Sequence, residues 1–407
     1  MEHILISLRN LLRNYKRTSL TLSILVLGVV GMLVYAGYID FSMWGLREQT
    51  IRGGLGHIQV YKKGYSSRGN QSYLKYLMEN EKEIQRLLLS TPHVQEATSG
   101  MEVRGLLSNG ETSEMTMCRG YDLSSVSVIR DSYTIHMGAF PSSNDSYDIA
   151  LGTGLAAKLD ADIGSYLTLM TTTRDGALNA ADFKVVSIIK TGVKEYDNML
   201  SIIPIRFARS LLDVQAAEKF IVMLDKTEAV PLVTESLRRG AAETHLGIEL
   251  RTWSDLADFY HRVKSMNDTY FLITQLIILV IVAFSIINTM RMVIYERMRE
   301  IGTIRAIGMT RTKVVLMFLY EGVWLGLFAI IAGIIAAHAV ASVINLSGGI
   351  FIPPPPGQSE GYHTMIRPNV IRYFEVSGIV MVSVIAGSLL PAFRAANIKI
   401  DEALRYV

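Results

Sequence analysis

The charged residues with the most distinctive spacing lie together between residues 296 and 308. They are Glu296, Arg297, Arg299, Glu300 and Arg305. Apolar residues recur at every third position among them: Met298, Ile301, Ile304 and Ile307. This spacing is typical of a short amphipathic helix, and Gly308 follows where such a helix would end. The pattern predicts a helix that either docks in a groove of another protein or lies among lipid headgroups with its arginines on phosphates.

The rest of the sequence has no set of residues with the spacing of an enzyme's active site. Five histidines lie in the central part of the chain without metal-ligand spacing: His57, His93, His136, His245 and His261. Cys118 is the only cysteine, so it cannot form an internal disulfide, and it has no base beside it in the sequence. The sequence therefore predicts no catalytic residue, no metal site and no cofactor site.

A glycine pair invites comparison with a phosphate-binding loop. Gly152 and Gly154 open the segment LGTGLAAKLDADIGSYLTLM, and no third glycine follows three residues later. The segment is typical of a strand end, a glycine turn, a short helix and a second strand that begins at Gly164. The dipeptide Gly-Lys occurs nowhere in the chain, which excludes a Walker A loop. We expect a buried strand-helix-strand corner here and no nucleotide site.

Four apolar stretches of the sequence are long enough to cross a membrane as helices. They comprise residues 18–38, 270–290, 314–343 and 376–392. The chain is 50% hydrophobic and 19% charged, with a mean hydropathy of +0.28. These values are too apolar for an ordinary soluble protein and too charged for a wholly embedded one. We therefore predict four membrane spans and a water-soluble domain, in preference to central helices of a large soluble core.

Lysine and arginine placement predicts the orientation of the spans, because cationic residues near span ends stay in the cytoplasm. They gather in residues 1–17, 291–313 and 393–407. Both termini are therefore predicted to be cytoplasmic, and residues 39–269 and 344–375 to lie outside. The first stretch is long for a signal peptide and lacks a cleavage site, so it is predicted to be a retained anchor. The net charge of +3 belongs to these cytoplasmic loops and indicates no nucleic-acid surface.

Residues 39–269 show interleaved strand and helix patterns, which predict an α+β domain with mixed sheets. The predicted strands are 57–61, 102–107, 114–119, 166–170, 183–190, 201–205 and 220–224. The predicted helices are 72–89, 153–159, 206–212 and 229–239. Because no disulfide is available, this domain must be held together by its own apolar core.

Two polar positions and one loop of the spans require separate interpretation. Glu321 lies in the third span, where a carboxylate is costly unless it is paired. We expect it to pair with an arginine of residues 291–313 rather than to relay protons, and His338 to serve in polar packing. The loop after this span contains Phe351, Pro353, Pro354, Pro355, Pro356 and Gly357. Consecutive prolines form a stiff extended segment, which is either a rigid turn or a lip that contacts substrate or the outer domain.

Four segments together resemble the FtsX-like permeases of ABC transporters, a family that includes lipoprotein-releasing permeases and MacB-type exporters. The most specific is YERMREIGTIRAIGMTR at residues 295–311. The others are RNLLRNYKRTSLTLSILVLGV, the LGTGLAAKLDADIGSYLTLM block and the end LPAFRAANIKIDEALRYV. The order of one span, an outer domain and three spans also matches, and the layout is closest to the lipoprotein-releasing permeases. Ile400 stands where the family usually has proline.

The resemblance implies a multi-pass protein of the bacterial inner membrane with a MacB-like periplasmic domain between spans one and two. It implies a cytoplasmic ABC ATPase dimer, which would bind ATP and magnesium, and a second permease subunit, identical or homologous. The helix after the second span would contact the ATPase. Its coupling residues would be Glu296, Arg297, Arg299, Glu300, Ile301, Arg305 and Gly308.

The resemblance also implies a range of functions. The first is extraction or export of a lipoprotein or another amphiphile from the membrane, with membrane lipid and a periplasmic lipoprotein, carrier or adaptor as partners. The alternatives are a regulator that transports nothing and switches a periplasmic enzyme, and an exporter coupled to an outer-membrane duct. In each case the chain would not itself be an enzyme and would bind no nucleic acid.

Overall fold

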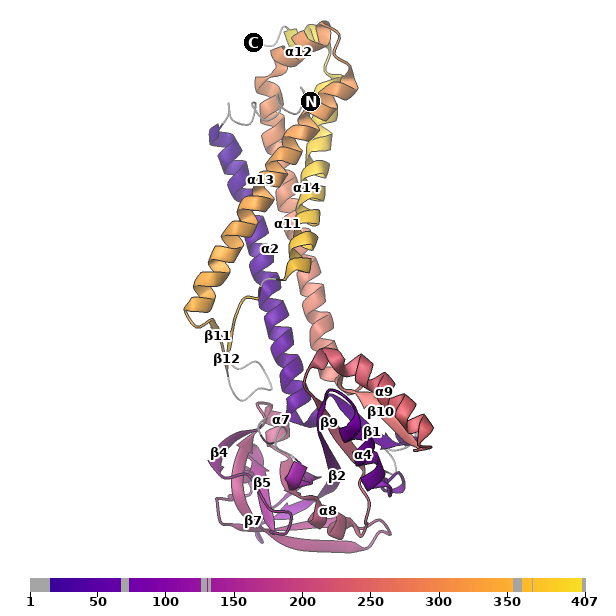
Figure 1. Cartoon of the computed structure of the whole chain (residues 1–407). Coiled ribbons are helices and arrows are strands. Elements are labelled where there is room, and N and C mark those ends of the chain that lie inside the picture. The colour runs from indigo at the N-terminus through magenta and orange to yellow at the C-terminus, as the bar shows by residue number, and fades with distance from the viewer. Residues whose placement is uncertain are drawn as a thin grey trace. The chain divides into compact units, whose positions relative to one another are not determined.

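The computed structural model describes residues 15–66, 73–125, 130, 133–353, 361–367 and 369–404. The chain divides into two compact units (Figure 1). The helical unit comprises Met1–Trp44, Val263–Phe351 and His363–Val407. The sheet unit comprises Gly45–Arg262 and Ile352–Tyr362. Each unit therefore combines segments that are far apart in the sequence.

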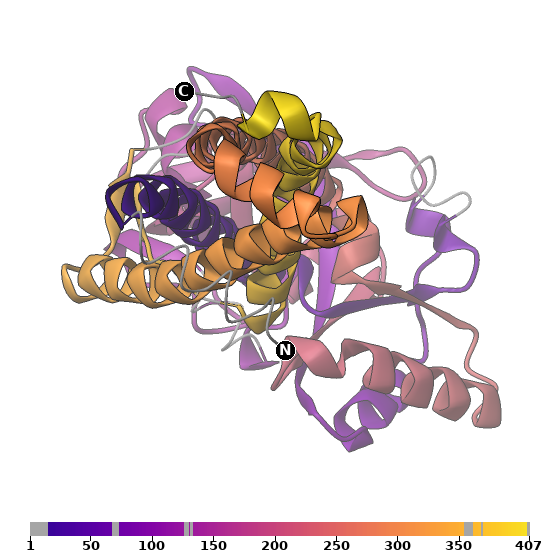
Figure 2. The same ribbon diagram turned by 90° about the horizontal axis from the view of Figure 1, so that it is seen from above.

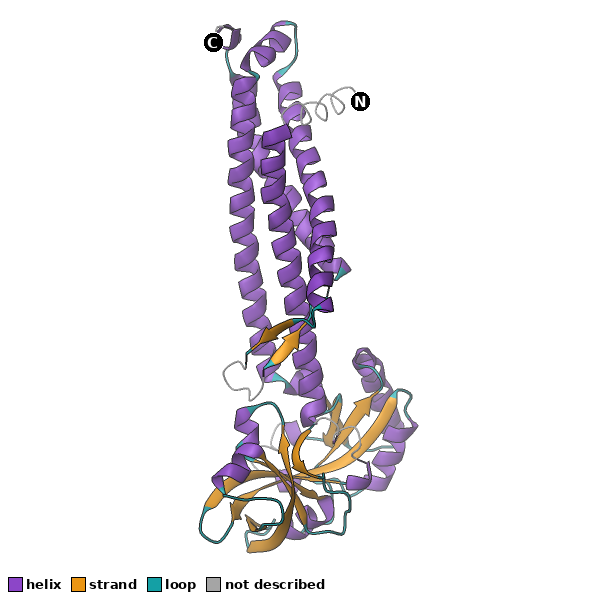
Figure 3. Cartoon of the chain, turned by 90° about the vertical axis from the view of Figure 1, so that its left-hand side faces the viewer, coloured by secondary structure: helices purple, strands orange, loops and turns teal. Residues whose placement is uncertain are grey.

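Four helices are long and apolar enough to cross a membrane, as the sequence predicted. They are α2 (Tyr15–Thr50), α11 (Asp258–Glu296), α13 (Arg311–Leu346) and α14 (Val370–Asn397). Within the helical unit they run side by side (Figures 1 and 3). Each helix contains one predicted span and continues beyond it, so the limits of the membrane along each helix stay a prediction.

Shorter elements join the long helices. Helix α12 (Met298–Ala306) connects α11 with α13, and α15 (Ile400–Leu404) follows α14. These two short helices pack against each other at one end of the helical unit (Figure 2). Between α13 and α14, β11 (Ile350–Ile352) and β12 (Tyr362–Thr364) pair as a two-stranded sheet. The base of the predicted proline-rich loop is therefore a hairpin, whereas Pro354, Pro355, Pro356 and Gly357 lie outside the described residues.

The four long helices pack around one shared apolar core, since each has an apolar face turned toward the others. Fully buried residues come from every helix: Leu25 and Val29 in α2, Ile286 in α11, Phe318 and Ala329 in α13, and Val376 and Val384 in α14. Many outward side chains of α11 and α13 are apolar and exposed, among them Ile277 and Phe328. Such exposure is expected of surfaces that face lipid or another membrane protein.

The sheet unit is built on one ten-stranded mixed sheet, which confirms the α+β prediction while placing the strands in a single sheet. The order along it is β10-β1-β9-β2-β3-β8-β5-β7-β4, and β6 pairs with β2 and β7. The central strands are β1 (Ile58–Lys62), β9 (Lys219–Leu224), β2 (Val94–Ser108), β3 (Ser113–Tyr121) and β8 (Leu200–Pro204). The others are β4 (Thr134–Gly138), β5 (Asp148–Gly152), β6 (Tyr166–Thr172), β7 (Leu178–Lys190) and β10 (Ile248–Thr252). Among the strand pairs of this sheet in the described residues, β3/β8 and β5/β7 are parallel and the others are antiparallel.

Helices cover two of the three apolar cores that pack on this sheet. One core lies under α4 (Glu81–Ser90) and α9 (Val230–Glu243) and includes Leu88, Phe220 and Leu237. The other lies under α6 (Thr153–Lys158) and α8 (Ile205–Leu212). The described residues of the unit also form shorter helical turns: η1 (Ile51–Leu55), η2 (Tyr73–Lys75), η3 (Leu123–Ser125), α7 (Lys194–Asp197), η4 (Thr227–Ala229) and α10 (Trp253–Leu256).

The predicted helix 72–89 is wrong in its first half. The structure has an α-helix only from Glu81, and residue 72 lies outside the described residues. Met78 is drawn into the core, and its backbone N–H donates to the Ala217 carbonyl at 2.8 Å in an isolated bridge. That N–H is therefore not available to a helix, so tertiary packing overrides the local helical pattern.

Candidate functional site

The charged run identified in the sequence begins at the last residue of α11 and continues through helix α12, which lies between two breaks in the helical backbone. Helix α11 ends at Glu296, and the backbone of Arg297 leaves the helical region with φ −105° and ψ 13° before α12 begins. At the other end Gly308 takes a φ of +107°, which glycine adopts without strain. Thr310 then precedes α13. The amphipathic helix predicted from residues 296–308 is thus present as a separate short element.

Arg297 is buried beside two carboxylates, with 6% of its surface exposed. Its Nε lies 3.0 Å from Glu300 Oε2 on α12, and its Nη1 lies 3.6 Å from Glu321 Oε2 on α13. Glu321 is only 3% exposed. The expectation that Glu321 pairs with an arginine of the connecting segment is therefore confirmed, and the pair links α12 to α13.

The C-terminal segment covers one side of α12. The guanidinium of Arg305 donates to the backbone carbonyl of Ile398, and Ala403 of α15 is buried. Arg311 Nη1 donates to Asn397 Oδ1 at 3.1 Å. The sequence identified the C-terminal motif only by resemblance and did not predict this packing, since no periodicity in so short a segment indicates its partner.

The predicted coupling residues divide into two groups by exposure. Glu296, Arg299, Glu300 and Gly308 are exposed. Arg297 and Ile301 are buried, and Arg305 is half-buried against the C-terminal segment. Ile307, which the sequence placed on the apolar stripe, is 83% exposed because it lies beyond the last residue of α12. The exposed group is accessible to a second protein, and the buried group can act by holding α12 in place.

The hairpin after α13 is anchored on α2. Asn345 forms two hydrogen bonds with the backbone of Ile366, donating to its carbonyl and accepting from its N–H, each at 2.9 Å. Ile366 is buried against Gly37, where an added Cβ would lie 2.7 Å from Ile366 Cγ2. Thr364 is buried, and its hydroxyl lies 3.3 Å from that of Ser42. Phe351 stays 58% exposed beside His363, and Pro353 is exposed.

A polar cluster ties three helices together near this hairpin. Arg372 Nη2 of α14 lies 3.1 Å from Asp40 Oδ1 of α2, and Arg372 Nη1 lies 2.8 Å from Glu375 Oε2. Glu375 accepts in turn from Gln275 of α11 at 3.0 Å. The predicted polar packing of His338 is also present, because its Nδ1 lies 3.2 Å from the Tyr373 hydroxyl. Sequence reasoning did not find the cluster, whose members are up to 335 positions apart.

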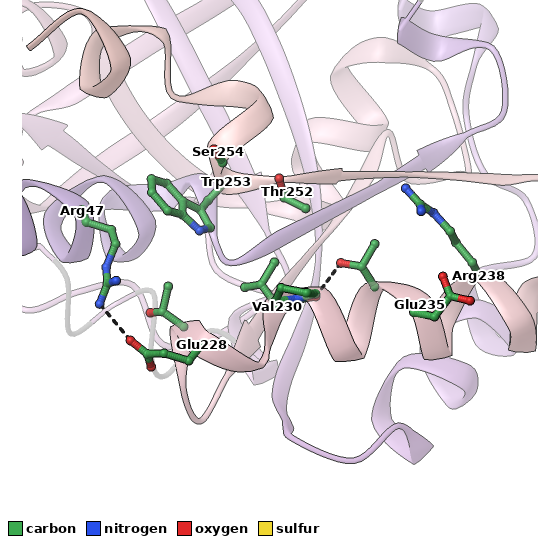
Figure 4. Close-up of a pocket in the computed structure, with 11 residues that line it drawn as sticks. Arg47, Glu228, Val230, Glu235, Arg238, Thr252, Trp253 and Ser254 are labelled. Carbon is green, nitrogen blue, oxygen red and sulfur yellow. Dashed lines mark hydrogen bonds and ion pairs between the residues drawn. The ribbon is translucent and has the colours of Figure 1, made fainter. Parts of the chain in front are cut away.

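The sheet unit contains an open cleft of about 640 Å³ along the face of α9. Trp253 and Val230 lie on opposite sides of it (Figure 4). Arg47 and Glu228, 3.4 Å apart, lie at one end, and Glu235 and Arg238 lie at the other. The lining thus combines an apolar centre with charges of both signs, which suits contact with a polar or amphiphilic molecule.

The glycine pair of the LGTG segment serves packing. A Cβ at Gly152 would collide with the backbone of Asp197, and one at Gly154 would collide with the Asn198 side chain. The strand-helix-strand corner predicted there is present as β5, α6 and β6. In the described part of the chain, no group of three histidine, cysteine, aspartate or glutamate side chains is placed to hold a metal ion.

Comparison with known proteins gives two family matches. The model of the FtsX-like permease C-terminal region matches residues 272–400, and that of the MacB-like periplasmic core domain matches residues 18–239. The lipoprotein-releasing system transmembrane protein LolC of Neisseria meningitidis serogroup B is 26% identical over an alignment of 421 residues, which covers 96% of this chain and 94% of that protein.

Two further similarities cover about half of the chain. The uncharacterized ABC transporter permease MJ1507 of Methanocaldococcus jannaschii is 28% identical over 226 residues, which cover 54% of each protein. Among solved structures, the periplasmic region of MacB from Actinobacillus actinomycetemcomitans matches at 12% identity and a TM-score of 0.39, over 52% of this chain and 95% of that one.

Proposed function

Since the chain belongs to the ABC transporter permeases that join a MacB-like periplasmic core domain to an FtsX-like C-terminal region, we propose that it couples a separate cytoplasmic ATPase to movement of its sheet unit. The observation that carries this proposal is the buried link from α12 to α13. Arg297 joins Glu300 of α12 to Glu321 of α13, so a push on α12 reaches a long helix directly. A helix that only rested on a membrane surface would need no such buried link.

The proposed contact with the ATPase dimer uses the exposed residues of this segment, namely Glu296, Arg299, Glu300 and Gly308. Ionic and hydrogen-bonding side chains on a short helix suit a polar groove of a partner protein. Arg297, Ile301 and Arg305 act from inside by fixing α12 to α13 and to the C-terminal segment. ATP and magnesium are proposed to bind the partner, since this sequence contains no Gly-Lys pair.

The proposed cargo is a lipoprotein or another amphiphile taken from the membrane. This rests on the similarity to LolC, named as a part of a lipoprotein-releasing system, because that similarity extends over nearly the full length of both proteins. The proposed location is a bacterial inner membrane with both termini in the cytoplasm, as the distribution of Lys and Arg indicates. A second permease subunit, identical or homologous, would complete the transporter.

The proposal is tested by affinity purification of the chain from its native membranes and identification of the ATPase that accompanies it. Arg299→Ala and Glu300→Ala should lower both the amount of copurified ATPase and its stimulation by at least tenfold, because both side chains are exposed on α12. The matched control is Arg239→Ala on α9 of the sheet unit, which should leave both quantities unchanged. If the two α12 variants bind and stimulate the ATPase normally, the role of α12 is wrong.

A further inference from the structure

The last turns of α2 extend into the sheet unit and end beside a buried histidine. Residues 45–50 of α2 belong to the sheet unit and are followed directly by η1. His57 lies just before β1 and is only 2% exposed. No motif in the sequence predicts a function for this histidine, and the coupling site at α12 does not involve it.

The hydrogen bonds of His57 determine where its proton lies. The backbone N–H of Leu224 donates to Nδ1 at 3.1 Å, so Nδ1 carries no hydrogen and the proton of the neutral ring is on Nε2. Nε2 lies 3.1 Å from the Thr227 hydroxyl oxygen and donates to it. The Thr227 hydroxyl then donates to Glu48 Oε1 at 3.2 Å. One directed chain therefore connects β9 through His57 and Thr227 to the end of α2.

The charged side chains around this series of hydrogen bonds hold the Glu48 carboxylate in place. Glu48 lies 3.2 Å from Arg47 and 3.4 Å from Arg52, and Arg47 also lies 3.4 Å from Glu228. Burial, the largest influence, lowers the pKa of His57 to about 4, with Arg52 and Arg47 acting in the same direction and Glu48 and Glu228 opposing them. The ring is therefore neutral near pH 7, as its hydrogen bonds require.

Further contacts hold η1, which directly follows α2, against the middle of the sheet. Arg119 of β3 donates to the Gly53 carbonyl at 3.4 Å, and Gln59 of β1 donates to the Leu55 carbonyl at 2.7 Å. The first turn of α11 instead contacts α10, where His261 Nε2 lies 2.8 Å from the Ser254 carbonyl oxygen. Helix α10 follows the edge strand β10, and the backbone N–H of its first residue, Trp253, donates to the His57 carbonyl at 2.9 Å. Helix α11 is thus connected to His57 through α10, whereas α2 is connected through its own Glu48 and through η1.

We propose that Glu48, Thr227 and His57 form a joint through which α2, rather than α11, moves the sheet unit. This inference rests on the proposed function, because the ATPase is the proposed source of the movement. The hydrogen bonds of the joint itself lie within this chain. These are positioning residues, because they fix α2 to the sheet and touch neither nucleotide nor cargo. Thr227 is the residue to alter, since its hydroxyl connects the His57 ring to the Glu48 carboxylate.

The first experiment measures the joint in the purified full-length chain without any partner. Thr227→Val keeps the shape of the side chain and removes the hydroxyl, whereas Thr227→Ser keeps the hydroxyl. We expect backbone hydrogen exchange in residues 46–58 to become about tenfold faster in the Val variant and to stay at the wild-type rate in the Ser variant. The control is Thr168→Val, which removes a hydroxyl-carboxylate bond of the same kind, to Asp182 on β7.

The second experiment measures transmission in vesicles that contain the chain and its copurified ATPase. Spin labels at Leu178 and Leu346, which are 85% and 88% exposed, report the distance between the two units. We expect ATP to change this distance in the wild type, in Thr227→Ser and in Thr168→Val. In Thr227→Val the change should be lost while ATP hydrolysis continues.

The two experiments separate the two claims. If Thr227→Val exchanges at the wild-type rate, or retains the ATP-dependent change of distance, the joint is refuted. If the wild type shows no ATP-dependent change, the proposed function fails, and the exchange rates still decide whether the joint exists.

Discussion

At the level of single residues, buried charges carry the most direct prediction. Arg297 is buried between Glu300 and Glu321, and removing one partner of a buried ion pair leaves the other charge unsolvated. Arg297→Met should therefore lower the free energy of unfolding by about 3 kcal/mol. The measurement is the unfolding midpoint of the detergent-purified chain, and Arg299→Met, the same substitution at an exposed site on α12, serves as the control.

The double variant Arg297→Met/Glu321→Met distinguishes charge from packing. It removes both charges from the interior, so most of the lost stability should return. If the loss of unfolding free energy in the double variant equals the sum of the losses in Arg297→Met and Glu321→Met, the ion pair is not the source of the effect. ATPase stimulation should stay low in the double variant, since α12 is no longer tied to α13.

His57 gives a prediction of pH dependence. Its pKa is about 4 in the folded chain and near 6.5 when unfolded, so between these values the unfolded state binds more protons. The stabilisation from neutral His57 is therefore fully present above pH 6.5. As the pH falls toward 4, the free energy of unfolding decreases by about 3 kcal/mol in total. The measurement uses a protein in which Trp44 and Trp324 are replaced by Phe and His57 is retained. Denaturant unfolding followed by Trp253 fluorescence should show this dependence of the free energy of unfolding on pH.

His57→Asn supplies the comparison for that slope. Its amide oxygen can still accept from the Leu224 N–H, and it does not titrate in this range. The difference in unfolding free energy between wild type and variant should therefore shrink by about 3 kcal/mol as pH falls from 6.5 to 4. A difference that is constant over this range would show that His57 does not have the lowered pKa.

Sequence reasoning reached some of these residues and missed others for a physical reason. It predicted that Glu321 pairs with a nearby arginine, because an apolar span makes an isolated carboxylate costly. It could not find the Glu48, Thr227 and His57 joint, because Thr227 is 170 positions from His57 and such contacts exist only after the sheet has formed. Long-range polar contacts of this kind leave no periodic pattern in a single sequence.

At the level of elements, the anchoring of the hairpin on α2 depends on Gly37. A side chain there would displace Ile366, and the N–H of Arg367 also donates to the Gly37 carbonyl at 3.2 Å. We expect Gly37→Val to speed backbone hydrogen exchange in residues 361–367 by tenfold or more, because this segment can no longer pack closely against α2. Hydrogen exchange followed by mass spectrometry of the full chain measures this directly.

Gly31 provides the matched control on the same helix, since a Cβ added there meets nothing within 4 Å. Gly31→Val should leave the exchange of residues 361–367 unchanged while making the same change in helix propensity. Equal effects of the two variants would show that any disturbance of α2, and not contact with Ile366, loosens the hairpin.

The elements themselves were predicted to different degrees. Length and hydropathy were sufficient for the four long helices, and alternation was sufficient for strands such as β3 and β6, because both signals are local. The edge strands β4 and β10 were missed, as was the β11/β12 hairpin. Their short segments gain strand structure from pairing with a neighbour and not from their own pattern.

At the level of the whole molecule, the order of elements and the family of the chain agree with the sequence prediction, whereas its orientation in the membrane stays a prediction. The charged segments predicted to be cytoplasmic include α12, and the sheet unit is predicted to lie on the opposite side. These two sides can be distinguished because each unit presents highly exposed positions, Leu178 in one and Ile307 in the other.

The single native cysteine makes this test unusually simple. Cys118 is fully buried on β3, and burial raises its pKa to about 12. Because the thiolate is the form that reacts with maleimides, the wild-type chain should remain unlabelled in intact cells and after lysis. A cysteine introduced at an exposed site would therefore give a signal without a background from the native thiol.

We expect Leu178→Cys to react with a membrane-impermeant maleimide in spheroplasts, and Ile307→Cys to react only after the inner membrane is opened. The physical reason is the retention of Arg and Lys beside α12 on the cytoplasmic side. Labelling of Ile307→Cys in intact spheroplasts, or protection of Leu178→Cys there, would reverse the orientation. In that case α12 could not meet a cytoplasmic ATPase, so this one measurement bears on the topology and on the proposed coupling together.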